Sequence, residues 1–197
     1  MKSVFIFIFF FLFSVNSSIS QINHEYIKIG EDVPKIEGID QFNRTIDSDQ
    51  ILKESNILLL FYRGNWCPYC KKHLARLQEN LEELSKNGVY VIVVTPEKTE
   101  KVQETTLNLN ITFSIIHDVS NKIMIDYKVA FEVNAQNVPS YLSFTQKKIK
   151  EYNELQNNTL PVPATYLIGK ENKVIYAHYN PDYKKRAGFN EILNVLN

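Results

Sequence analysis

The amino-acid sequence has only two cysteines in 197 residues, Cys67 and Cys70. This count excludes a structural zinc site built from four cysteine ligands. A disulfide between residues so close in the chain would close a very small loop, which removes little entropy from the unfolded state. A local structural disulfide is therefore a weak explanation, and we interpret the pair as chemically reactive.

The sequence also has no excess of charge of either sign, because 22 lysine and arginine residues stand against 22 aspartate and glutamate residues. A balanced chain is not drawn as a whole to nucleic acid or to an anionic membrane surface. We therefore expect neither nucleic acid nor a membrane among the partners of the mature protein.

Long apolar runs are scarce, and the run at the start of the chain, residues 4–13, is short. A transmembrane anchor needs about 20 apolar residues, so this run is too short for one. It follows the basic residue Lys2 and precedes small polar residues that end at Ser20. This pattern predicts a signal peptide over residues 1–20, cleaved after Ser20, and hence export to the periplasm, a lumen or the extracellular space.

The remaining residues, 21–197, show no repeat, low-complexity tract or linker, so we predict a single domain. The apolar runs 57–62 and 89–94 are typical of strands buried on both faces. Between them, leucines recur at helical spacing and stop at Asn87-Gly88, which predicts a helix that starts at Pro68. The later patterns predict helices over 98–109, 120–127, 138–155 and 189–196, a strand over 114–117, and a hairpin of strands 166–168 and 174–176.

This order of elements predicts an α/β fold with a mixed central β-sheet flanked by helices on both faces. The succession strand–helix–strand, connector, strand–strand–helix is that of the thioredoxin fold. The predicted helices of the connector form a helical insertion before the closing β-hairpin.

The cysteine pair lies where a buried strand gives way to a helix. Pro68 suits the first helical position, where its missing N–H costs nothing. Cys67 is then the helix cap, and unpaired backbone N–H groups at the positive end of the helix dipole favour its thiolate. Cys70 lies one turn along, so its sulfur can form a disulfide with that of Cys67. We predict that Cys67 is the attacking catalytic cysteine and Cys70 the resolving one.

Two residues outside the pair have two interpretations each. Trp66 either frames a disulfide substrate or is a core anchor whose indole N–H finds a partner. Pro163 precedes the hairpin, where a thioredoxin fold has a cis proline that faces the cysteines. The alternative for Pro163 is a turn proline that starts a strand.

Residues 61–70 resemble the active-site segment of peroxiredoxin-like proteins in the alkyl hydroperoxide reductase and thiol-specific antioxidant family, of the thioredoxin superfamily. They read Phe61-Tyr62-Arg63-Gly64-Asn65-Trp66-Cys67-Pro68-Tyr69-Cys70. The resemblance extends to Gly30 and Pro34, to residues 160–166, and to residues 180–183 with Arg186. It therefore covers most of residues 27–190.

The resemblance implies an enzyme without a cofactor that reduces hydroperoxides. Cys67 would attack the peroxide and become a sulfenic acid, and Cys70 would condense with it to a disulfide. An external thiol reductant, such as a thioredoxin-like protein, would then reduce the pair. The residues that support the cysteines in this likeness are Arg63, Trp66, Pro68, Pro163 and Thr165.

The sequence departs from the family pattern at three places. Leu60 and Gly64 occupy the positions where mainstream members have proline and threonine. Mainstream members also have an arginine near the position of Pro163, which is not arginine here. Those groups orient and polarise the peroxide in the family. Arg63 and Arg186 are the candidates to replace them.

Two other functions compete with the peroxidase. The first is a thiol–disulfide oxidoreductase that acts on exported proteins, which Trp66 and Pro163 would also suit. The second is a copper(I) carrier, because paired thiolates bind soft metals. Such carriers typically have a wider cysteine spacing and a histidine that faces the pair. His117 and His178 have no place in the motif of this chain, so we expect no metal.

Overall fold

The structure, a computed structural model, describes residues 25–135 and 141–196. The predicted signal peptide and the first residues of the predicted helix 138–155 lie outside the described residues.

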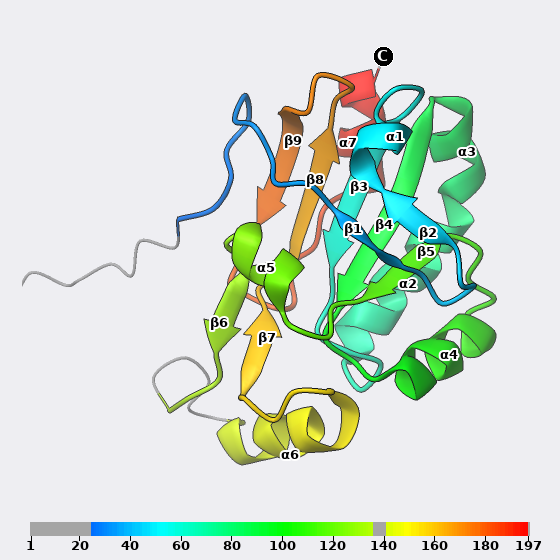
Figure 1. Cartoon of the computed structure of the whole chain (residues 1–197). Helices are drawn as coiled ribbons and strands as arrows, with labels where there is room; N and C mark the ends of the chain where they lie inside the picture. The colour runs from blue at the N-terminus through cyan, green and yellow to red at the C-terminus, as the bar shows by residue number, and fades with distance from the viewer. Residues whose placement is uncertain (1–24, 136–140, 197) are drawn as a thin grey trace, which may run out of the picture.

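A five-stranded mixed sheet forms the centre of the molecule, in the order β5–β4–β3–β8–β9 (Figure 1). Its strands are β3 (Asn56–Phe61), β4 (Val89–Thr95), β5 (Ser114–His117), β8 (Ala164–Ile168) and β9 (Val174–Tyr179). β3, β4 and β5 are parallel, whereas β8 is antiparallel to β3 and β9 to β8. The two continuous apolar runs are thus the inner strands β3 and β4, as expected for strands with both faces buried.

Helices cover both faces of this sheet, as predicted. On one face, Leu58 and Leu60 of β3 share a core with residues of the helices α2 (Pro68–Glu79), α3 (Leu81–Lys86), α4 (Thr99–Asn108) and α7 (Phe189–Leu196). On the other face, Ile57 and Leu59 pack with the N-terminal segment and α5 (Lys122–Asp126). Successive strand residues point to opposite faces, so each apolar run serves both cores. In Figure 1, α2 lies behind the sheet and α5 in front of it.

The connector between β5 and β8 contains α5, β6 (Ala130–Glu132), α6 (Leu142–Tyr152) and β7 (Thr159–Pro161). This confirms the predicted helical insertion before the closing hairpin. β6 and β7 pair antiparallel, and α6 lies beyond them at the end of the molecule (Figure 1). The N–H of Lys98 donates to the carbonyl of Tyr152 at 2.8 Å. The insertion is therefore tied to the turn after β4, at the edge of the sheet where the parallel strands end.

Some elements differ from the sequence-based prediction. The hairpin of β1 (Glu37–Ile39) and β2 (Thr45–Asp47), together with α1 (Ser48–Ile51), was not predicted, because elements of three or four residues show no periodicity. The helix predicted from Pro68 onward is divided at Asn80, whose side-chain Nδ2 donates to the carbonyl of Arg76 at 2.7 Å. The predicted stop is confirmed, since Gly88 takes a φ of +69° after α3.

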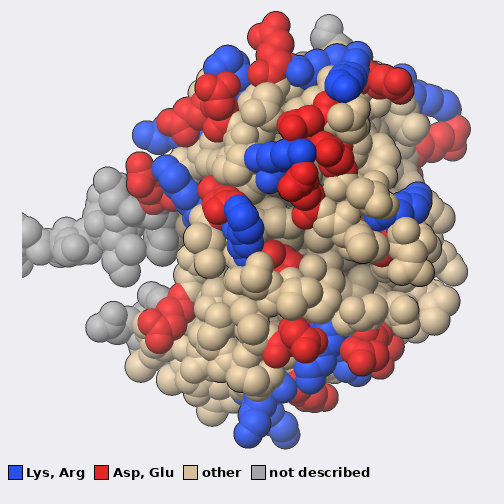
Figure 2. All heavy atoms as spheres, viewed as in Figure 1, with Lys and Arg blue, Asp and Glu red and all other residues tan. Residues whose placement is uncertain are grey.

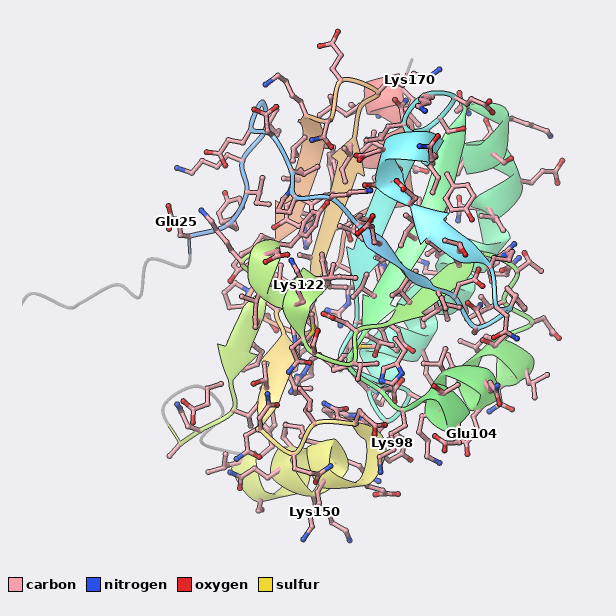
Figure 3. The ribbon with its side chains drawn as sticks, in the orientation of Figure 1. Glu25, Lys98, Glu104, Lys122, Lys150 and Lys170 are labelled. Carbon is pink, nitrogen blue, oxygen red and sulfur yellow. The ribbon has the colours of Figure 1, made fainter. Side chains whose placement is uncertain are left out.

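Basic and acidic side chains are interspersed on the face of the molecule in Figure 2, as the balanced composition suggests. Lys150 on α6 and Lys170 in the turn between β8 and β9 point away from the body of the molecule (Figure 3). Within the described ranges, no helix combines the length and the apolar character that crossing a bilayer requires.

Candidate active site

The two cysteines lie at the start of α2, as predicted. Cys67 is the N-cap residue with extended backbone angles, and Pro68 takes the first helical position. The chain turns sharply from β3 into α2 through Gly64, whose φ is +147°. A Cβ on Gly64 would lie 2.5 Å from Nε1 of Trp66 and 2.8 Å from Oε1 of Glu97. The glycine is therefore required both by the turn and by the close packing behind it.

The two sulfurs differ in their access to a ligand. Cys67 and Cys70 are both free thiols and both buried, at 2% and 1% exposure. Cys67 nevertheless lines a cavity of about 330 Å³, and Cys70 is not among the residues that line it. A small molecule in this cavity meets the sulfur of Cys67 first.

The two sulfurs also differ in charge. Burial by itself raises the pKa of Cys70, but a hydrogen bond from Cys67 and the charge of Arg186 lower that pKa to about 6. Nη2 of Arg186 lies 3.4 Å from the sulfur of Cys70. The same hydrogen bond to Cys70, together with burial, raises the pKa of Cys67. The two thiols therefore titrate as a pair, and the charge of Arg186 favours the form in which Cys70 is the thiolate.

The prediction that the helix start ionises Cys67 takes in only one of the charges that act on the pair. The N-terminus of α2 does face Cys67, as predicted. Arg186, however, comes from a segment 116 residues further along the chain and contacts the other sulfur. Because one proton is shared by the pair, Cys67 becomes the thiolate when that proton moves to Cys70.

Arg63 is a buried cation in the wall of the cavity. It directly follows β3 and is only 2% exposed. Its Nε and Nη2 atoms have no hydrogen-bond partner within the part of the chain that the structure describes. Its guanidinium carbon lies 5.2 Å from the ring centre of Trp66 and 5.1 Å from that of Tyr183, within cation–π distance of both. A positive charge is therefore buried between aromatic rings beside the cavity.

Four of the predicted site residues meet at this cavity. Its lining consists of one cation, aromatic rings, a proline and the attacking sulfur: Arg63, Trp66, Cys67, Pro68, Tyr69, Tyr141, Phe144 and Tyr183. Trp66 is half-buried, and its indole N–H has no partner among the described residues. Its ring packs edge-on against Phe144 of α6, with centroids 6.1 Å apart. Trp66 therefore packs against the core as the anchor interpretation expects, but its indole N–H lacks the predicted partner among the described residues.

The prediction of a cis proline at Pro163 is also wrong. The described residues contain no cis peptide bond, and Pro163 is not among the residues that line the cavity. The N–H of Val162 donates to the carbonyl of Val129 at 2.7 Å, so the chain runs extended from β7 into β8. In this extended path the usual trans form of an X–Pro bond suffices.

Thr165 lies inside the sheet rather than at the cavity. It is 2% exposed, belongs to β8, and is paired with Leu60 of β3 and His178 of β9. In this arrangement the supporting role predicted for Thr165 is to stabilise the sheet.

Glu97 is a functional candidate that the sequence analysis missed. It follows β4 and is fully buried. Its Oε1 accepts a hydrogen bond from the N–H of Asn65 at 2.7 Å, and its Oε2 accepts one from the hydroxyl of Tyr62 at 3.0 Å. Burial raises the pKa of Glu97 to about 7 despite these two bonds, and the charge of Cys70 adds to the rise. The position of Glu97 just after β4 could have indicated it. β3 and β4 are parallel, so the residues that follow them lie at the same edge of the sheet.

The copper hypothesis finds little support in the arrangement. Across residues 25–135 and 141–196, no three histidine, cysteine, aspartate or glutamate side chains group closely enough to hold a metal ion. His117 lies on β5, where its Nδ1 is 3.3 Å from the hydroxyl of Thr99, and His178 lies on β9. The cysteine pair therefore has no third ligand of these types.

Comparison with known proteins places this site in a family context. The model of the AhpC/TSA family matches residues 29–177. Peroxiredoxin Bcp of Escherichia coli K12 is 24% identical over 170 residues, which are 86% of this chain and 96% of that protein. The thiol-disulfide oxidoreductase ResA of Oceanobacillus iheyensis is 24% identical over 123 residues, 60% of this chain. That match spans 62% of ResA, less than two thirds of its length.

Solved structures show the same fold. The peroxidoxin BcpB of Mycobacterium tuberculosis superposes with a TM-score of 0.66 at 15% identity, covering 87% of this chain and 97% of that one. A peroxiredoxin-like protein of Aquifex aeolicus superposes with a TM-score of 0.64 at 16% identity, covering 87% of each chain. The predicted thioredoxin fold is therefore confirmed.

Proposed function

Because the chain belongs to the AhpC/TSA family, we propose that it is a peroxiredoxin-like thiol peroxidase whose Cys67–Cys70 pair cycles between dithiol and disulfide. The family membership confirms the resemblance seen in residues 61–70. The observation that carries the proposal is the position of Cys67, at the start of α2 and in the wall of the cavity, with Cys70 in hydrogen-bond contact behind it. Both members of a reactive pair are thus present, and one of them is open to a small substrate.

The first step of the cycle oxidises Cys67. Its proton moves to Cys70, and the thiolate of Cys67 attacks one oxygen of a hydroperoxide. The O–O bond breaks, Cys67 becomes a sulfenic acid, and the other oxygen takes the proton from Cys70 and leaves as an alcohol or water. Arg63 is the charged residue among those that line the cavity, so its positive charge lies near this step. Leu60, Gly64 and Pro163 have no polar side chain with which to polarise the peroxide. Arg63 takes over this role.

The second step forms the disulfide. The thiolate of Cys70 attacks the sulfur of the Cys67 sulfenic acid, the S–O bond breaks, and the hydroxide that leaves takes up a proton from solvent to become water. Arg186 supports this step, because its charge favours Cys70 as a thiolate. An external dithiol of the thioredoxin type then supplies two electrons and returns the pair to the reduced state. The cycle requires no bound cofactor.

Stopped-flow kinetics test the proposal. The reduced protein is mixed with hydrogen peroxide or an organic hydroperoxide, and the loss of thiol is followed together with the fluorescence of Trp66. We expect oxidation much faster than that of free cysteine at the same pH. Oxidation of Cys67 no faster than that of free cysteine with either class of peroxide would refute the peroxidase.

A thiol–disulfide oxidoreductase is the second candidate. The similarity to ResA favours it, as do Trp66 and the 40% exposed Tyr69 on either side of Cys67 and Pro68. Reduction of a protein disulfide such as those of insulin separates the two functions. Fast insulin reduction combined with slow peroxide reduction would favour this candidate over the peroxidase.

We also propose that the protein is exported after removal of residues 1–20, which the charge and hydropathy pattern of that segment supports. Expression of the full chain in a secreting host, followed by N-terminal sequencing of the exported product, tests this. The expected first residue is Gln21. Retention of the intact chain inside the cell would contradict the proposal.

A further inference from the structure

The turn between β3 and α2 is bonded both to the cysteine pair and to a buried carboxyl. Within it, the carbonyl of Gly64 accepts a hydrogen bond from the N–H of Cys67 at 3.0 Å. The N–H of Asn65 donates to Oε1 of Glu97 at 2.7 Å. A Cβ on Gly64 would lie only 2.8 Å from that same oxygen, so the turn closes directly over the carboxyl. Cys67 and Glu97 are therefore neighbours across one short stretch of backbone.

The carboxyl of Glu97 is shut off from water. The residue has an exposure of 0%, and its Oε2 accepts a hydrogen bond from the hydroxyl of Tyr62 at 3.0 Å. Burial raises the pKa of Tyr62 well above its ordinary value, so Tyr62 remains a neutral donor. In surroundings without water, a nearby charge is screened little. The free energy of ionising Glu97 therefore depends strongly on the charges around it.

Two charged groups from neighbouring helices act on Glu97. Burial raises the pKa of Glu97 most, the charge of Cys70 in α2 raises it further, and that of Lys101 in α4 lowers it. The segment after α6 pairs with the backbone of Glu97 through the neutral residue Asn153, and the charged residue beyond it, Glu154, is exposed. Of these groups, only the cysteine changes its charge with the redox state, because a disulfide cannot ionise.

We propose that Glu97 is a redox-linked proton acceptor, which binds a proton when the Cys67–Cys70 disulfide is reduced and releases that proton when the disulfide forms. The inference rests on the proposed function, in which the pair cycles between dithiol and disulfide. In the reduction, an external dithiol gives up two electrons and two protons. The disulfide and the carboxylate of Glu97 become one thiol, one thiolate and one neutral carboxyl.

This exchange keeps the buried charge of the site constant. The negative charge lies on Glu97 while the disulfide is present and on the pair after reduction, so two negative charges are not buried side by side. Glu97 touches no substrate and acts through the cysteines. It is therefore a positioning residue rather than a catalytic one.

The direction of the pH effect follows from the charge on the pair. In the reduced protein, burial and the charge of Cys70 raise the pKa of Glu97 to about 7, whereas the pKa of Cys70 is lowered to about 6. Between these values the pair holds a thiolate while Glu97 is protonated. The disulfide has no charge, so oxidation lowers the pKa of Glu97 and the proton leaves. The proton uptake at Glu97 should therefore be largest between about pH 6 and 7.

A redox titration counts the protons. The protein is equilibrated with mixtures of reduced and oxidised dithiothreitol at a series of pH values, and the fraction of disulfide gives its reduction potential. Between about pH 6 and 7, the wild type should take up two protons with two electrons, whereas Glu97→Gln should take up one, because glutamine binds no proton. One proton fewer changes the equilibrium constant about tenfold per pH unit, which is about 30 mV for this two-electron couple.

Two further variants separate the titration of Glu97 from its shape. Tyr62→Phe keeps the carboxyl but removes the hydroxyl that stabilises its charge, so the two-proton range should extend to higher pH. Glu79→Gln is the matched control, because Glu79 is an exposed carboxylate at the end of α2. It should leave the proton number unchanged.

Infrared difference spectroscopy detects the proton in the wild type itself. Reduction of the disulfide at pH 6.5 should produce the C=O stretch of a protonated carboxylic acid, and oxidation should remove it. The band should be absent from Glu97→Gln and present in Glu79→Gln. A Glu97 that only holds the turn by its hydrogen bond to Asn65 would move neither this band nor the proton number.

The outcomes separate the inference from the function on which it rests. If Cys67 and Cys70 form no disulfide at any ratio of the dithiothreitol couple, the proposed function itself is refuted. If the disulfide forms and Glu97→Gln takes up as many protons as the wild type, the cycle stands and the proton acceptor is wrong. Should Glu97→Gln fail to fold, a carboxylic acid band that does not change with the redox state of the wild type would overturn the inference equally.

Discussion

The two sides of the cysteine pair are built for different tasks. On the outer side, Cys67 faces an aromatic cavity with one buried cation, Arg63. On the inner side, Cys70 lies against Arg186 and within electrostatic reach of the buried carboxyl of Glu97. Two identical side chains one helical turn apart thus differ in access and in charge. The comparison shows that the residues around each cysteine, rather than the spacing of the pair, assign attack to Cys67 and resolution to Cys70.

Replacing each cysteine in turn should have the largest effect on activity and tests the assigned roles most directly. Cys67→Ser should lower peroxide turnover by at least about 10³-fold, because the nucleophile is lost. Cys70→Ser should still undergo the first oxidation but should stop before disulfide formation, which leaves a sulfenic acid. Mass spectrometry after one equivalent of peroxide, with dimedone as a trap, distinguishes the two variants. Full activity of Cys67→Ser would show that the nucleophile lies elsewhere.

Glu97→Gln tests the inner side through stability. Because the pKa of Glu97 is raised from 4.5 to about 7 in the folded protein, the folded state binds more protons than the unfolded state between these values. Stability should therefore fall as the pH rises through this window, by on the order of 2–3 kcal/mol in the free energy of unfolding. Glutamine keeps the shape, and its Oε1 still accepts from the N–H of Asn65, whereas its Nε2 donates to the hydroxyl of Tyr62 in place of accepting from it. Glutamine does not ionise, so the variant should lose this pH dependence.

Urea unfolding at pH 5 and pH 8 measures the effect. Glu79→Gln is the control, because Glu79 is an exposed carboxylate at the end of α2. Equal pH dependence in the wild type and Glu97→Gln would contradict the assignment.

Arg186→Met tests the charge on the resolving sulfur. Without the guanidinium 3.4 Å away, the pKa of Cys70 should rise above about 6 towards its ordinary value. At neutral pH, each unit by which the pKa of Cys70 exceeds 7 lowers the thiolate population about tenfold. Disulfide formation should slow in the same proportion. Thiolate absorbance at 240 nm against pH, and single-turnover closure of the disulfide, report the two effects. The exposed neighbour Lys185→Met should shift neither, and an unshifted titration in Arg186→Met would remove Arg186 from the mechanism.

Pro163→Ala should have the smallest effect, because Pro163 lies on neither side of the pair. Its peptide bond is trans, and it does not line the cavity. We expect peroxide kcat/KM within about twofold of the wild type and a loss of about 1 kcal/mol in the free energy of unfolding. Steady-state kinetics and urea unfolding check this. A tenfold loss of kcat/KM would restore the role that a thioredoxin fold assigns to this proline.

Local patterns were sufficient for most of the fold. The apolar runs of β3 and β4, the leucine spacing of α2 and α3, and the closing hairpin were predicted from sequence, because each depends on periodicity within one segment. The short strands β1, β2, β6 and β7 were not, since their three residues gain stability only from a partner. Trp66 shows the same limit at the site. Its place before the cysteines was visible, whereas its open indole N–H depends on what the fold leaves unfilled around it.

The sequence by itself determined where the reactive pair lies and that it sits at the start of a helix, because Pro68 and the strand before it act over a few residues. Only the tertiary structure decided which cation lies beside each sulfur and which residues line the cavity. Arg186 reaches Cys70 across 116 residues, and Phe144 meets Trp66 from the insertion. Electrostatic and packing interactions depend on distance in space, so they are not fixed until the chain is folded.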